Sequence, residues 1–146
     1  MIPVELEKYV LLVPPQLKDN GAPASLTYAD TKGWGHIRVL VAVGTTDIAT
    51  TAAPLLQSSN VSGSGYAAIT SAALADAIAD DEDGLLFAID VDLTRGDVGR
   101  YVKMLITAGD GTTGTNLAVL GILSRPMSGS NAGLAADSGL TELISV

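Results

Sequence analysis

HIRVLVAV, at residues 36–43, is the clearest strand signal in the chain. Every second residue from Ile37 to Val43 is β-branched and apolar, and His36 and Arg38 lie in the positions between. A repeat of two is the period of a β-strand, because successive side chains point to opposite faces. The pattern therefore predicts a strand with one face in a hydrophobic core and the other toward solvent.

Similar short runs, rich in Val, Ile, Leu, Tyr and Thr and closed by Gly, Pro, Asn or Asp, occur along the rest of the chain. They lie at residues 6–13, 24–29, 53–58, 66–70, 84–93, 100–108 and 116–124. We expect the first run to end at Pro14-Pro15, and the runs at 53–58 and 66–70 to form a hairpin. Regularly spaced short strands predict an antiparallel sandwich or barrel, and of these we expect an all-β antiparallel β-sandwich. The Ala-rich segment 71–79 is expected to form one short helix at most, or an irregular crossing.

The runs at 84–93, 100–108 and 116–124 are expected to pair as adjacent hairpins at the centre of the domain. In that arrangement Lys103 lies on the strand next to Asp90 and Asp92 and pairs with one of them. The predicted core consists of inward-facing residues of these runs and of 36–43: Ile37, Val39, Val41, Phe87, Ile89, Val91, Val102, Met104, Ile106, Leu120 and Ile122.

A length of 146 residues is typical of a single domain. We expect residues 1–125 to form the sandwich, with an N-terminal arm at its start. Residues 126–146 are rich in Ser, Gly and Ala and are expected to be a flexible C-terminal tail or interaction arm. Extended apolar ends can add a strand to a neighbour's sheet edge, so deleting 127–146 is expected to weaken binding or oligomerisation while the sandwich stays folded.

Charge and composition exclude several classes of function. The chain has 8 Lys and Arg residues against 16 Asp and Glu, a net charge of −8, which disfavours nucleic acid and anionic membranes as partners. It has no cysteine and a single histidine, so thiolate metal sites and His-rich sites are excluded. The apolar run from Val10 to Val13 is too short for a secretion signal. The longest uncharged stretches, such as Thr112 to Ser124, do not reach the ~20 apolar residues that a membrane helix requires.

Three patterns were candidates for chemistry. Asp90 and Asp92 share one strand face and could bind Ca²⁺ together with the acidic turn at 80–83, but the EF-hand pattern is not met. His36 is the only possible base of a Ser-His-Asp site, and the Gly-x-Ser-x-Gly elbow is missing. The Gly-rich turns at 63–68 and 109–116 lack the elements of a phosphate loop. We therefore expect no enzymatic activity, no metal and no cofactor.

Several short motifs follow one another between Tyr9 and Pro126. They read YVLLVPP (9–15), YADTKGWGHIRVLVAVG (28–44), APLLQSSNVSGSGYAAIT (53–70), DGLLFAIDVDL (83–93) and RYVKMLITAGDGTTGTNLAVLGILSRP (100–126). In this order they resemble the capsid decoration, or cement, proteins of tailed double-stranded DNA bacteriophages. The segment after Pro126 has no counterpart in that likeness.

The resemblance implies a jelly-roll-like β-sandwich fold. It also implies a structural virion protein on the outer capsid surface, which stabilises the capsid by bridging capsomers. The partners it implies are the major capsid protein and further copies of the chain, as a homotrimer or alternatively a homodimer. Contacts with the capsid or other subunits are expected from both ends of the chain and from the tryptophan: Ile2, Pro3, Val4, Trp34, Leu140, Leu143 and Ile144.

The main alternative is a receptor- or glycan-binding β-sandwich module of a phage tail or fibre. Trp34, between Gly33 and Gly35, would then be an exposed stacking platform. A second interpretation of Trp34 places it in the core, at the mouth of the sandwich.

Overall fold

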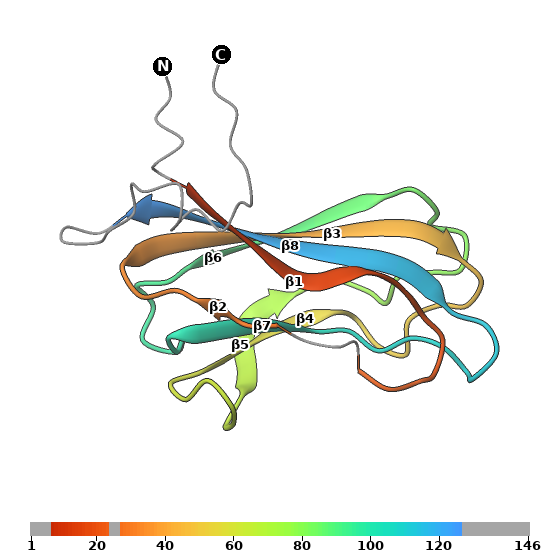
Figure 1. The fold of residues 1–146 in the computed structure, drawn as a ribbon, viewed down its shortest axis with the longest axis horizontal. Coiled ribbons are helices and arrows are strands. Elements are labelled where there is room, and N and C mark those ends of the chain that lie inside the picture. The colour runs from red at the N-terminus through yellow and green to blue at the C-terminus, as the bar shows by residue number, and fades with distance from the viewer. Residues whose placement is uncertain (1–6, 24–26, 127–146) are drawn as a thin grey trace, which may run out of the picture.

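A two-layered β-sandwich forms the part of the chain that the computed structural model describes, residues 7–23 and 27–126 (Figure 1). The described residues form eight strands and no helix. The strands are β1 (Glu7–Lys18), β2 (Ala29–Asp30), β3 (Trp34–Thr46), β4 (Leu55–Ser59), β5 (Ala67–Ala73), β6 (Leu86–Asp92), β7 (Tyr101–Leu105) and β8 (Thr115–Pro126).

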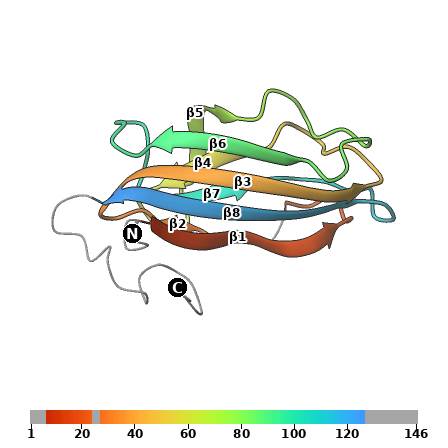
Figure 2. The ribbon, with the colours of Figure 1, turned by 90° about the horizontal axis from the view of Figure 1, so that it is seen from above.

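The strands are arranged in the order of a jelly roll. One sheet has the order β1-β8-β3-β6 and the other has the order β2-β7-β4-β5. All pairings are antiparallel, and β1 with β8, β2 with β7, β3 with β6 and β4 with β5 form four nested pairs. The two layers lie one above the other in Figure 1, and Figure 2 shows the β1-β8-β3-β6 sheet from above. The predicted antiparallel sandwich is therefore confirmed.

Alternation along the strands places the core between the two sheets. In β3 the residues Ile37, Val39 and Val41 are fully buried, as their period-2 pattern predicts. Leu56, Val102 and Met104 of the second sheet are also fully buried and face them across the sandwich. Burial of this apolar surface is the main source of stability for the fold.

Two predicted core residues are wrong. Leu120 and Ile122 are half-buried, whereas Val119 and Leu123 of the same strand are fully buried. Because β8 is apolar on both faces, its sequence did not say which face points inward. Phe87 is partly buried against the core, and the other predicted core residues are buried.

The predicted succession of adjacent hairpins is also wrong. β6 and β8 both pair with β3, on opposite sides of it, and β7 lies in the other sheet. Connections that cross from one sheet to the other separate strands that follow one another in sequence, which is how a jelly roll is built. Among the eight strands of the described residues, only β4 and β5 are adjacent both in sequence and in a sheet.

The first strand continues past the point where it was predicted to end. β1 runs to Lys18, and its register with β8 shifts between Leu11 and Val13 and again between Val13 and Gln16, around Pro14-Pro15. β1 is an edge strand, where the missing N–H of a proline leaves no neighbouring carbonyl unpaired. Bulges and prolines at an edge also discourage unwanted strand pairing.

Segment 71–79 forms no helix. β5 extends to Ala73, and an irregular crossing follows, in which Ile78 is buried. Among the described residues there is no helix long and apolar enough to cross a lipid bilayer.

Candidate functional site

An uncharged apolar surface covers the centre of the outer face of the β1-β8-β3-β6 sheet. Strand register places its side chains in rows: Leu11 of β1 is opposite Leu120 of β8, which is opposite Leu40 of β3. Leu86 on β6 has 64% of its surface exposed, more than any other large hydrophobic residue in the described part of the chain. We call this surface the apolar patch; it consists of Leu11, Leu17, Leu40, Ala42, Leu86, Ala88, Ala118 and Leu120.

A shallow groove of about 490 Å³ opens into the apolar patch. Its walls come from three strands and include Pro15, Leu17, Ala42, Asn116 and Ala118. Contiguous exposed apolar surfaces of this kind mark sites of contact with other molecules. The groove has few polar groups to orient a small ligand, so it favours a protein contact over a ligand site.

A polar network lies on the same outer face, beside the apolar patch. The Nδ1 atom of His36 is 3.0 Å from the hydroxyl oxygen of Ser124, and its Nε2 atom is 3.2 Å from a carboxylate oxygen of Asp90. Arg38 donates two hydrogen bonds to Asp90, of 2.9 and 3.0 Å. These bonds to Arg38 hold the pKa of Asp90 below its usual value, and His36 lowers it further. The network joins β8, β3 and β6.

This Ser-His-Asp contact was not predicted, although the alternation of apolar residues in the sequence already placed His36 and Asp90 on the outward faces of their strands. The sequence does not show that β3 lies between β6 and β8 in the sheet. This strand order brings Asp90 and Ser124 to opposite sides of His36. A nucleophilic site also needs N–H groups aimed at the developing oxyanion. Here the β3 backbone pairs with strands on both sides, and Asp90 is engaged by Arg38. The geometry favours a structural network over a nucleophile.

Asp92 and Lys103 are not partners, contrary to prediction, because they belong to different sheets. Asp92 accepts a hydrogen bond from the Thr94 hydroxyl and lies 3.6 Å from Arg125. The ammonium group of Lys103 lies 4.1 Å from the centre of the Tyr66 ring, a cation–π contact.

A tyrosine cluster lies on the opposite side of the molecule, at the β2-β7-β4-β5 sheet. The rings of Tyr28 and Tyr101 are 5.1 Å apart and meet edge to face. The guanidinium group of Arg100 lies 5.0 Å from the Tyr101 ring and pairs with Asp30 at 2.6 Å. Burial and the neighbouring tyrosines raise the pKa of Tyr66. Tyr28 is exposed, so the cluster can be reached from solvent.

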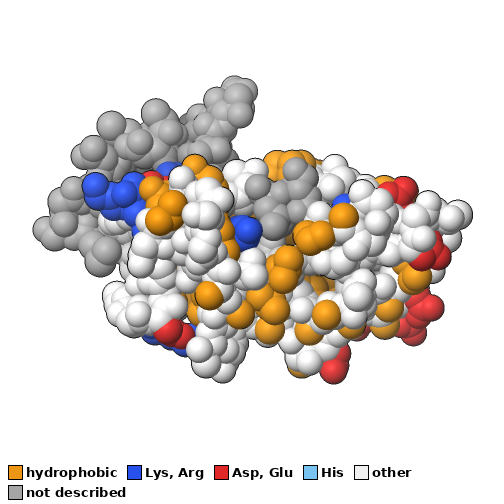
Figure 3. Space-filling model, turned by 90° about the horizontal axis from the view of Figure 1, so that it is seen from below, with side chains coloured by type: hydrophobic (Ala, Val, Ile, Leu, Met, Phe, Trp, Pro, Cys, Tyr) orange, Lys and Arg blue, Asp and Glu red, His pale blue; other side chains and the backbone are white. Residues whose placement is uncertain are grey.

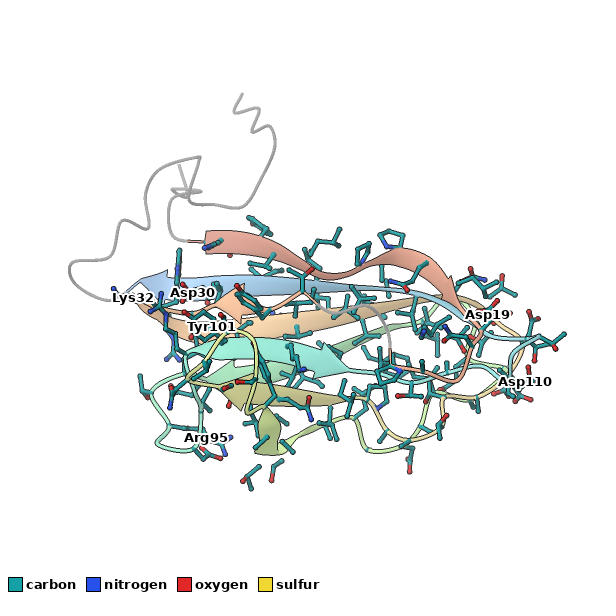
Figure 4. The ribbon with its side chains drawn as sticks, turned by 60° about the horizontal axis from the view of Figure 1, so that its bottom comes forward. Asp19, Asp30, Lys32, Arg95, Tyr101 and Asp110 are labelled. Atoms are coloured by element: carbon teal, nitrogen blue, oxygen red, sulfur yellow. The ribbon has the colours of Figure 1, made fainter. Side chains whose placement is uncertain are left out.

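Charge is separated along the length of the sandwich (Figures 3 and 4). We call one end the acidic end; it is formed by the segments that connect β1 to β2, β3 to β4, β5 to β6 and β7 to β8. These segments and the end of β1 contain eight carboxylates and one cation: Asp19, Asp47, Asp76, Asp80, Asp81, Glu82, Asp83 and Asp110, against Lys18.

The other end, which we call the arginine end, carries five of the eight described cations, and two more lie along the adjoining strands, Arg38 in β3 and Lys103 in β7. Its segments connect β2 to β3, β4 to β5 and β6 to β7, and both Glu7 and Ser124 lie there, opposite each other in β1 and β8. Four carboxylates at this end and along the adjoining strands each pair with an arginine: Asp30 with Arg100, Asp90 with Arg38, Asp92 with Arg125, and Asp97 with Arg95.

The acidic turn at 80–83 is exposed at Asp80, Asp81 and Asp83, as predicted. Two of its carboxylates accept backbone hydrogen bonds: Asp83 from the Thr46 N–H at 2.6 Å and Glu82 from the Ala79 N–H at 2.8 Å. In the described part of the chain, no three His, Asp or Glu side chains are grouped so that they could hold a metal ion.

Trp34 is a core residue, with 5% of its surface exposed. The core interpretation of this residue is therefore confirmed, and the exposed platform is wrong. It belongs to the cluster of buried hydrophobic residues that forms the core. The other predicted contact residues, Ile2, Pro3, Val4, Leu140, Leu143 and Ile144, lie outside the described residues, as does the predicted tail at 127–146.

These features define a β-sandwich domain whose most distinctive surfaces are the apolar patch, the acidic end and the arginine end with its ion pairs. Comparison of the sequence with models of known protein families and with curated proteins found no match.

Proposed function

We propose that the chain is a structural virion protein that decorates the outer surface of a phage capsid and stabilises it by bridging capsomers. The charge separation along the sandwich is the observation that carries the proposal. A chain with a net charge of −8 concentrates its cations at one end, which gives it one end suited to contact with carboxylates of the major capsid protein.

The position of the chain ends supports the same orientation. Glu7 and Ser124 are opposite each other at the arginine end, so the segments before and after the sandwich both start from this end. Those segments contain the predicted contact residues, from Ile2 to Val4 and from Leu140 to Ile144. A contact made by cations and by extended ends together would grip neighbouring capsomers without any chemical step.

Stabilisation then follows from mass action. A protein that binds the closed shell more tightly than the opened shell raises the free energy of opening by the difference in binding. The net charge of −8 would keep decorated particles from associating with one another.

Binding to capsids that lack the chain tests the proposal. Purified full-length chain is mixed with such capsids, and the particles are imaged by electron cryomicroscopy. We expect extra density at regular lattice positions and less density for Lys32→Glu at the arginine end. The control adds the same net charge at the acidic end, with Thr51→Glu and Thr112→Glu together, and should bind like the unchanged chain. Lack of regular density, or equal binding by Lys32→Glu, would contradict the proposal.

A receptor- or glycan-binding module of a tail or fibre is the second candidate, and the tyrosine cluster is the observation that favours it. Tyr28 and Tyr101 offer ring faces and edges for sugar stacking, with Asp30 and Arg100 beside them for hydrogen bonds. Binding of the chain to a glycan array, abolished by Tyr28→Ala, would favour this function. Lack of binding to any glycan, with capsid decoration intact, would exclude it.

A further inference from the structure

We propose that two copies of the chain pair through the apolar patch, face to face, with their long axes antiparallel. A homodimer is one of the two oligomers that the resemblance implies. The pairing face, the twofold symmetry and the antiparallel orientation go beyond that resemblance. They concern only the chain itself and do not rest on the proposed capsid function.

The position of the patch suits self-pairing. Its rows cross the middle of the strands, at Leu40 and Ala42 in β3 and at Ala118 and Leu120 in β8. A twofold axis through the centre of the sheet therefore superposes the patch on its copy in a second chain, the condition for a contact in which both copies use the same surface.

The charge of the chain explains why the occupant is a second copy. Two molecules of net charge −8 repel each other unless they meet where neither carries charge. The patch meets that condition, because its central rows contain only Leu and Ala on β8, β3 and β6, and on β1 they contain Leu11 and the two prolines at the register shift. Exposed Leu86 at one edge and exposed Leu11 at the other widen the apolar contact to both edge strands.

Charge separation selects the orientation. An axis along the strands would place the two acidic ends side by side, with their eight carboxylates each. An axis across the strands places each acidic end beside the partner's arginine end, where Lys32, Arg95 and Arg100 lie. The antiparallel pair keeps the two acidic ends apart and is therefore favoured, most strongly at low ionic strength. The arginine end adds little attraction, because Arg95 and Arg100 are already paired with Asp97 and Asp30.

The size of the patch fits a pair of moderate affinity. Four strands about 4.8 Å apart, with rows about 7 Å apart along them, give an apolar area of roughly 300–400 Å². A standard interface buries about 800 Å² on each partner. The patch is therefore the apolar centre of such an interface, and the flanking row with Tyr9, Arg38 and Asp90 forms part of its polar rim.

Antiparallel pairing also explains how such a small chain could bridge two neighbouring capsomers. In the pair, the two arginine ends point in opposite directions along the long axis. A dimer of this kind presents two equivalent contact ends about one strand length apart, roughly 40 Å for the 13 residues of β3.

Sedimentation velocity of the full-length chain tests the pairing, over about 1 to 100 μM. We expect a mass of two copies at the upper concentration. Leu86→Asp should raise the dissociation constant at least about 100-fold, because each substitution occurs twice across the twofold axis. Leu11→Asp, on the opposite edge strand β1, should also raise the dissociation constant. The matched control is Val61→Asp, which replaces another exposed apolar side chain, 59% exposed, far from the patch.

Spin-label distances test the orientation. The chain has no cysteine, so Thr112→Cys places a single label in the β7–β8 turn at the acidic end. The antiparallel pair predicts a label-to-label distance of about 40 Å or more, and a parallel pair predicts less than about 20 Å. Four outcomes would each overturn the inference. In sedimentation they are a single-copy mass at 100 μM, a three-copy mass, or an unchanged dissociation constant in Leu86→Asp and Leu11→Asp. In the spin-label experiment it is a label-to-label distance below about 20 Å. Failure of capsid binding would not affect these readouts.

Discussion

Two threonines that face each other across the sheet differ in one hydrogen bond. Thr46 of β3 and Thr115 of β8 are partners in the register, and both are buried. The Thr115 hydroxyl donates to the Ile48 carbonyl at 2.8 Å, whereas the Thr46 hydroxyl has no partner among the described residues. A buried hydroxyl that loses its contacts with water and gains none in the protein costs free energy.

Replacing each threonine by valine should therefore have opposite effects. Thr46→Val removes an unsatisfied hydroxyl and should raise the free energy of unfolding by up to about 1 kcal/mol. Thr115→Val leaves the Ile48 carbonyl unpaired and should lower it by about 1–2 kcal/mol. Urea unfolding of the two variants measures both values. A loss of stability in Thr46→Val equal to that in Thr115→Val would show that the Thr46 hydroxyl has a partner after all.

At the scale of the element, the polar network ties together strands that come from distant parts of the sequence. Arg38 of β3 and Asp90 of β6 lie 52 residues apart and form two hydrogen bonds. Their pairing helps to hold the edge strand β6 on the sheet. Surface ion pairs contribute little in general, and this one is solvent-exposed on both sides.

The contribution of Asp90 should disappear in acid. Its pKa is lower in the folded chain than the unfolded value of about 3.9, so the ionised carboxylate stabilises the fold above that value. As the pH falls through the folded pKa, Asp90 is protonated and the contribution is lost. Asp90→Asn should therefore lower the free energy of unfolding slightly at pH 7 and leave it unchanged near pH 2. A stability difference that persists at low pH would mean that packing, and not charge, makes Asp90 important.

The positions of most strands along the sequence were predicted better than the strands with which they pair. Period-2 alternation identified β3 and β6 and the faces that they bury, because alternation depends only on neighbouring residues. It could not identify the inward face of β8, where Leu120 and Val119 are both apolar. It could not assign β7 to the second sheet either, because sheet membership depends on connections that leave no local signal.

At the scale of the whole molecule, the concentration of carboxylates at the acidic end works against stability. Eight carboxylates and one lysine share this end, and like charges that are brought together by folding repel each other. Added salt screens such repulsion over a distance of about 10 Å at 0.1 M.

Stability should therefore rise with salt and with a single charge reversal. At about 1 μM chain and pH 7, we expect the melting temperature to increase from 0.01 to 0.5 M NaCl. Asp81→Lys should raise it at low salt by a few degrees, the usual effect of about 1 kcal/mol. The control is Asp97→Lys at the arginine end, which breaks the pair with Arg95 and should not raise it. An equal rise in both variants would mean that net charge matters and its position does not.

Local patterns in the sequence determined the all-β class, the single sandwich, most of the core and the excess of negative charge. The tertiary structure decided the rest: the jelly-roll strand order, the burial of Trp34, the contact of His36 with Ser124 and Asp90, and the separation of charge between two ends. The physical reason is the distance along the chain over which each kind of signal acts. Alternation and turn residues act over a few positions along the chain, whereas a surface is assembled from strands that long connections bring side by side.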